Sequence, residues 1–99
     1  MSDDAEQFDP EALQAEIDEI DQQLMLLLGL RFRCTDQLSA VLVDQGAKEG
    51  PGPGDDRIQF MENLAQDTGV SPALAIVLMR AVAQAVQENH ERIKASRTH

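Results

Sequence analysis

The chain has 99 residues, enough for one domain with one hydrophobic core. Hydrophobic residues make up 42% of it and aromatic residues 3%, so its apolar mass is Leu, Ile, Val, Ala and Met, which favours packed helices over sheets. Eighteen acidic and eight basic residues leave a net charge of −10. This sign argues against nucleic acid as a partner, because nucleic-acid-binding surfaces are basic.

The few cysteine and histidine residues limit the kinds of site that the chain can form. The single cysteine, Cys34, excludes a disulfide within the chain and a zinc site built on cysteines, and we expect it to be a buried, unreactive thiol. With two histidines besides, neither a metal ion nor a cofactor is expected. No apolar run approaches the roughly 18 residues of a membrane span, and the acidic first residues do not resemble a signal peptide, so a cytoplasmic protein without membrane contact is expected.

Residues 1–9 are acidic and are predicted to be disordered. Asp9, Pro10 and Glu11 then form a typical helix start, with an acid at the cap and a proline in the first turn. Beyond them apolar residues recur at steps of three and four, which predicts one helix from about Pro10 to about Asp44. The apolar stripe comprises Leu13, Ile17, Ile20, Leu24, Leu27, Leu28, Leu38 and Leu42, with Arg31 and Thr35 between them.

This first helix is too long for a compact domain of this size. About 33 residues at a rise of about 1.5 Å each make a rod of about 50 Å. A compact domain of 99 residues measures about 26 Å across, twice its expected radius of gyration of about 13 Å. One chain cannot cover the apolar stripe of such a rod, so the sequence predicts a partner chain.

Two further helices follow a glycine- and proline-rich connection. Residues 45–54 contain four Gly and two Pro and are predicted to form a loop. A short helix is expected over residues 55–67, and a medium helix from Pro72, capped by Ser71, to about Ile93. Residues 10–94 then form one helical domain, and residues 95–99 are expected to fray. The fold class is all-α, with a long, a short and a medium helix.

The segment from Leu13 to Arg31, LQAEIDEIDQQLMLLLGLR, resembles the first helix of the all-helical class of chorismate mutases, L-R-x-x-I-D-x-I-D-x-x-L-L-x-L-L-x-x-R. The resemblance continues through Asp56-Arg57 at the start of the second helix and GVSP at residues 69–72, and it covers about residues 11–93. It implies an intertwined helical homodimer in which the long helices of two subunits cross. Isochorismate-pyruvate lyases share this fold.

The resemblance also implies a chemistry. Chorismate mutases rearrange chorismate to prephenate in a unimolecular pericyclic step without a covalent intermediate. Because the substrate is a dicarboxylate, arginines must bind its two carboxylates, in bidentate fashion where the geometry allows. Negative charge develops on the breaking ether oxygen, where preorganised donors supply most of the electrostatic stabilisation.

Two of the substrate-binding arginines of the family have counterparts here, and two of its charged positions are altered. Arg31 matches the second arginine of the first helix, and Arg57 matches an arginine at the start of the second helix. Gln14 stands where an arginine reaches into the partner's site, and Leu42 stands where a lysine faces the ether oxygen. Two alternatives remain open: an interhelical ion pair for Arg31 and a plain surface position for Arg57.

In the third helix, His90 falls on the position of the glutamine that faces the ether oxygen, and Val86 falls on a small hydroxyl residue one turn earlier. The resemblance therefore implies that His90, with Arg31, carries catalysis. The alternative for His90 is a half-exposed histidine with satisfied hydrogen bonds. Lys48 lies in the predicted loop, from which it is a candidate to replace the lysine missing at Leu42.

Two functions of different classes are compatible with these residues. The first is a chorismate mutase-like isomerase acting on chorismate or a related dicarboxylate, either retargeted or at least about 10²-fold less active because donors to the oxyanion are missing. The second is a non-catalytic helical dimer that regulates a partner enzyme or binds an aromatic acid. An isochorismate-pyruvate lyase is a third, and it too is expected to need the lysine that Leu42 replaces.

Overall fold

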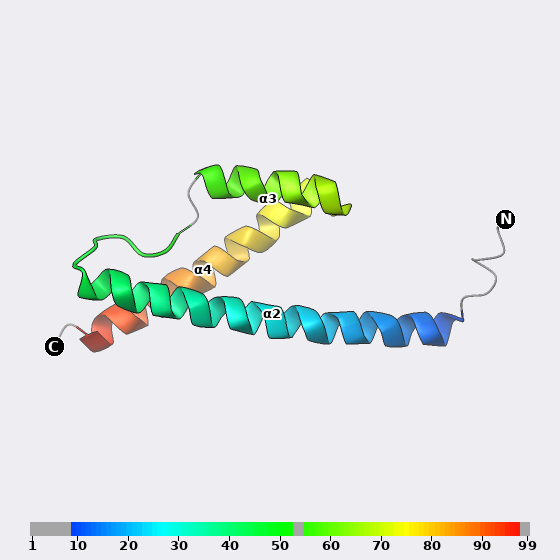
Figure 1. The fold of residues 1–99 in the computed structure, drawn as a ribbon, viewed down its shortest axis with the longest axis horizontal. Coiled ribbons are helices and arrows are strands. Elements are labelled where there is room, and N and C mark those ends of the chain that lie inside the picture. The colour runs from blue at the N-terminus through cyan, green and yellow to red at the C-terminus, as the bar shows by residue number, and fades with distance from the viewer. Residues whose placement is uncertain (1–8, 53–54, 98–99) are drawn as a thin grey trace. The chain divides into compact units, whose positions relative to one another are not determined.

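A computed structural model of the chain describes residues 9–52 and 55–97, with the side chains of 55 and 56 left out (Figure 1). The described residues form three helices: α2 (Pro10–Asp44), α3 (Asp55–Thr68) and α4 (Pro72–Arg97). The predicted all-α class is confirmed, although α4 is a second long helix of 26 residues rather than a medium one. The predicted disordered segment lies outside the described residues except for Asp9.

Helix α2 begins and ends where the sequence predicts. At its start, the Asp9 carboxylate accepts a hydrogen bond of 3.4 Å from the Glu11 amide, as expected of the cap. At its end, Gly46 has φ +76° and the Ala47 amide donates 2.9 Å to the Leu42 carbonyl. This pattern satisfies carbonyls at the helix end and needs a left-handed residue, which glycine adopts without strain. Helix α3 ends in the same way at Gly69, with φ +78°.

Helix α4 extends past its predicted end. Its start is as expected, since Pro72 is its first residue and the Ser71 hydroxyl accepts 3.4 Å from the Leu74 amide. The predicted fraying of residues 95–99 is wrong for residues 95–97, which are helical, whereas 98–99 lie outside the described residues. An ion pair between Arg97 and Asp44 holds this last turn, and the cations of Lys94 and Arg97 complement the negative end of the helix dipole.

The chain divides into two units, Met1–Phe32 and Arg33–His99. In the second unit, α3 packs against α4 (Figure 1). The buried apolar residues of this unit are small: Ala65, Ala75, Val82 and Val86. Two polar residues, Ser39 and His90, are buried with them.

Helix α2 carries large apolar side chains that the chain leaves uncovered. Their exposed fractions run from 39% at Leu13 to 69% at Leu26. Large apolar side chains exposed in this way indicate a surface for association with another chain, and therefore oligomerisation. No described helix combines the length and the apolar character that a crossing of the bilayer requires. The exposed large apolar residues of α2 are Leu13, Ile17, Ile20, Leu24, Met25, Leu26, Leu27, Leu30, Leu38 and Val41.

Candidate functional site

Two buried polar side chains mark the candidate site. His90 on α4 is 2% exposed and Ser39 on α2 is 1% exposed. Neither His90 Nδ1 nor Ser39 Oγ has a hydrogen-bond partner within the described part of the chain. Buried polar atoms are nearly always paired in native proteins, so two unpaired atoms in one small unit call for an explanation.

The His90 ring lies against the connection between α2 and α3. A Cβ atom built on Gly50 would come within 2.7 Å of His90 Cγ, closer than real Cβ atoms come to other atoms. Glycine is therefore required at position 50 for the backbone to cover the ring. The alternative of a half-exposed histidine with satisfied hydrogen bonds is wrong, because the side chain is 2% exposed and its Nδ1 has no partner among the described residues.

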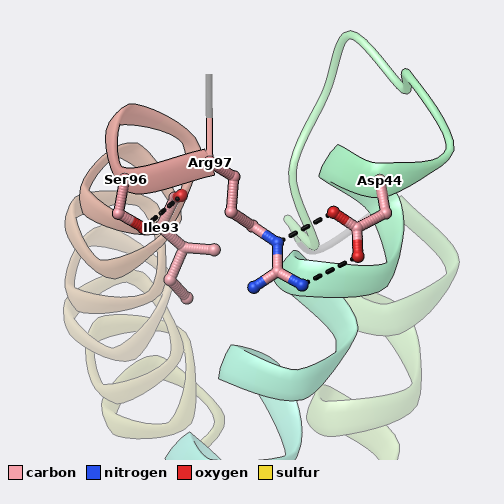
Figure 2. Close-up of polar contacts among 4 residues, drawn as sticks. All are labelled: Asp44, Ile93, Ser96 and Arg97. Carbon is pink, nitrogen blue, oxygen red and sulfur yellow. Dashed lines mark hydrogen bonds and ion pairs between the residues drawn. The ribbon is translucent and has the colours of Figure 1, made fainter. Parts of the chain in front are cut away.

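The end of α2 and the end of α4 meet through polar residues. Arg97 Nε and an Arg97 terminal nitrogen each donate 2.8 Å to the Asp44 carboxylate, as Figure 2 shows. These hydrogen bonds, together with the positive charge of Arg97, lower the pKa of Asp44 below its ordinary value. Nearby, the Ser96 hydroxyl donates 2.9 Å to the Ile93 carbonyl, within the same helix (Figure 2).

A polar cavity of about 270 Å³, wide open to solvent, lies between these helix ends. Asp36 of α2 lines one side, and Arg92 of α4 lines the other together with neighbouring residues of its helix. The Arg92 guanidinium donates to the Asn89 amide oxygen, so it is already engaged. The full lining is Asp36, Asn89, Arg92, Ile93 and Ser96.

A smaller cavity of about 100 Å³ lies between α3 and α4. Its lining is apolar except for Arg80, so it holds no pair of acid–base groups. Elsewhere in the described residues, no group of three or more His, Cys, Asp or Glu side chains is arranged to hold a metal ion. The residues of the smaller cavity are Ile58, Met61, Ile76, Met79 and Arg80.

Three predicted site residues lie in the unit that holds Ser39. Val86 is buried one helical turn before His90, so the two share the buried face of α4. Leu42 is half-buried on α2, three residues after Ser39 and on the same side of that helix. Val86 and His90 therefore share the buried face of α4, and Leu42 lies near Ser39 on one side of α2.

The two basic candidates in the same unit are exposed. Lys48 lies in the connection beside Gly50, and its side chain is not covered. The Arg57 guanidinium lies over the Phe60 ring, 5.8 Å from its centre, a cation–π contact within α3. This geometry agrees with the surface alternative for Arg57.

Gln14 and Arg31 belong to the unit Met1–Phe32, and both are exposed on α2. Gln14 Nε2 donates 3.0 Å to the Asp18 carboxylate one turn later. These two residues therefore belong to a different unit from His90 and Ser39. Cys34 is exposed, so its predicted burial is wrong.

Sequence reasoning missed Ser39. The predicted stripe placed Leu38 on the buried side of α2, whereas Leu38 is 47% exposed and its neighbour Ser39 is buried. The available signal was the spacing of Ser39, four residues after Thr35 and three before Leu42.

Comparisons with known proteins add no relative. No family model matches the chain, and no curated protein or solved structure matches it. The interpretation of the site therefore depends on the residues described above and on the resemblance in the first helix.

Proposed function

We propose that the protein is a chorismate mutase-like isomerase of low activity that works as an intertwined homodimer. One observation supports this most strongly. A buried imidazole with an unpaired Nδ1 occupies the position at which the resemblance expects the donor to the ether oxygen. A buried side chain that lacks a hydrogen-bond partner is suited to receive one from a ligand.

In this proposal the substrate supplies every bond that changes. The C–O ether bond breaks and a C–C bond forms within one molecule, so no proton has to leave or arrive. With its proton on Nδ1, His90 donates to the ether oxygen as negative charge develops there. Arg31 and Arg57 bind the carboxylates, as the resemblance implies.

The altered residues account for the low activity. Leu42 is half-buried and apolar, so it offers no charge to the oxyanion. Loss of one preorganised donor costs about 10² to 10³ in rate. Gln14 weakens the binding of the substrate carboxylates further, since a neutral amide replaces a guanidinium.

The test is a direct assay of the purified protein with chorismate, in which chorismate loss is followed and the product is identified by NMR. We expect prephenate at a rate at least about 10²-fold below the 10 s⁻¹ of an ordinary enzyme. His90→Gln should keep activity because its amide also donates, and His90→Phe should abolish it. The absence of any product, or equal rates for His90→Phe and the unmodified protein, would contradict the proposal.

A non-catalytic dimer is the second candidate, and two observations favour it. Leu42 is apolar at a charged position of the family, and Gln14 bonds Asp18 within its own helix. On this alternative the protein binds an aromatic acid or a partner enzyme without turning over a substrate. Thermal stabilisation by chorismate without product would favour this alternative over the isomerase.

A further inference from the structure

The smaller cavity, between α3 and α4, combines an apolar interior with a single cation. We propose that it binds a small monocarboxylate with a branched aliphatic tail, the tail lying among the apolar side chains and the carboxylate on Arg80. None of the residues that line this cavity is among those assigned to chorismate. The inference therefore goes beyond the proposed function and does not depend on it.

The position of the cavity follows from the packing of α3 against α4. Next to the turn at Gly69, Ala65 of α3 and Ala75 of α4 are buried, with exposed fractions of 4% and 5%. Met61 lies four residues before Ala65, and Met79 lies four residues after Ala75, so each methionine is about one helical turn farther from the connection. The two helices separate in this direction (Figure 1), and the cavity lies between them there.

The lining residues share one face of each helix. On α3, Ile58 precedes Met61 by three residues, and on α4, Met79 and Arg80 follow Ile76 by three and four residues. The four apolar residues are half-buried. This cavity is much more enclosed than the polar cavity at the helix ends, so an apolar group that enters it is removed from water on most sides.

The size of the cavity limits the tail of the ligand. Its volume is about 100 Å³. An apolar cavity of about 150 Å³ accommodates a benzene ring, so this smaller one matches a short branched aliphatic chain better than an aromatic ring. The unbranched thioether side chains of Met61 and Met79 adjust readily to the shape of such a chain.

Arg80 determines the head group of the ligand. Its side chain is exposed, so it lies at the mouth of the cavity, and it forms no hydrogen bond or ion pair with any residue that the structure describes. No acidic side chain lines the cavity, and a guanidinium binds a carboxylate through two parallel hydrogen bonds. The net charge of −10 disfavours a ligand with a second anionic group, which would have no cation in this cavity to offset the repulsion.

An NMR titration of protein labelled in its methionine methyl groups tests the site, with 3-methylbutanoate, acetate and benzoate as probes. We expect 3-methylbutanoate to shift the signals of Met61 and Met79 and to leave that of Met25, on α2, unchanged. It should bind about 50-fold more tightly than acetate, because it buries three further carbons at about fourfold each. It should also bind more tightly than benzoate, whose ring exceeds the cavity.

The contribution of the cation is measured with Arg80→Gln and with the neutral probe 3-methylbutanamide. An exposed ion pair strengthens binding by about two- to fivefold, so we expect Arg80→Gln to lower the affinity for 3-methylbutanoate by this factor and to leave the affinity for the amide unchanged. Arg33→Gln is the matched control, since it removes the same charge from an exposed position of α2 and should leave both affinities unchanged.

Three outcomes would overturn the proposal. Equal affinities for acetate and 3-methylbutanoate would show that no aliphatic tail enters the cavity. Equal decreases in Arg80→Gln and Arg33→Gln, or equal affinities for the carboxylate and the amide, would remove Arg80 as the partner of the carboxylate. Unchanged signals of Met61 and Met79 throughout the titration would exclude the cavity as the binding site.

Discussion

At the scale of single residues, the contact between Gly50 and the His90 ring determines how the connection covers the site. The ring is held by burial on α4, and the approaching atoms of Gly50 are backbone, so neither side yields easily. The connection is therefore sensitive to one added methyl group at this position.

We expect Gly50→Ala to destabilise the protein by roughly 1–3 kcal/mol, the usual cost of forcing an extra carbon into a packed interior. The new Cβ would lie 2.7 Å from His90 Cγ. Urea unfolding gives the free energy, and Gly52→Ala is the control because a Cβ there meets nothing within 4 Å. Equal decreases in the free energy of unfolding of the two variants would show that the reduced flexibility of the chain, rather than the contact with the ring, causes the destabilisation.

Leu42 allows a direct test of the altered charge. If the isomerase proposal holds, Leu42→Lys should raise the rate of chorismate rearrangement by about 10²-fold, because it restores a charged donor to the developing oxyanion. Gln37→Lys adds the same charge at an exposed position of the same helix and should leave the rate unchanged. Similar increases in both variants would indicate a general electrostatic attraction of the substrate instead.

At the scale of elements, the Asp44–Arg97 pair ties the end of α2 to the end of α4. Its hydrogen bonds lower the pKa of Asp44 in the folded protein below the ordinary value of 3.8. A carboxyl group whose pKa is lower when folded contributes stability above its unfolded pKa and loses it as the pH falls through the folded pKa. The pair therefore stabilises the protein at neutral pH and ceases to do so in acid.

We expect Arg97→Gln to return the pKa of Asp44 toward its ordinary value, which a carboxyl carbon NMR titration measures. Amide hydrogen exchange in residues 95–97 should become faster, because the last turn of α4 loses its ion pair with Asp44. The loss of global stability should be small, since both side chains are largely exposed. Arg80→Gln serves as the control and should leave the pKa of Asp44 unchanged. An unchanged pKa of Asp44 in Arg97→Gln would contradict the ion pair between the two residues.

At the scale of the whole molecule, the apolar side chains of α2 remain to be covered. Leu24 and Leu27 belong to the predicted stripe, and both are largely exposed in the single chain. An apolar stripe of this kind buries itself against another helix, and the proposed function makes that helix part of a second copy.

We expect light scattering to give twice the chain mass of 10.9 kDa at micromolar concentration. Leu27→Glu should shift the protein toward the monomer, because it would place a charge within the buried stripe of the dimer. Gln23→Glu adds the same charge at a polar position and should leave the mass unchanged. A monomer mass for the unmodified protein would remove the homodimer from the proposal.

Much of the site was not predictable from the sequence because burial depends on distant partners. Leu38 and Ser39 are neighbours in the same helical pattern, and hydrophobicity alone favours Leu38 for the buried side. The structure buries Ser39 instead and leaves Leu38 47% exposed. His90 was identified only through the resemblance, and its unpaired Nδ1 became visible only in the structure.

The sequence by itself determined the helices and most of their ends. The Asp9 and Ser71 caps and the turns at Gly46 and Gly69 depend on backbone groups within a few residues, so local chemistry suffices. Only the tertiary structure decided that α4 continues to Arg97, since the ion pair that holds its last turn joins residues 53 positions apart. The burial of His90 beneath Gly50 was likewise decided only by the tertiary structure, because packing between distant segments depends on the volumes of all the side chains that meet there.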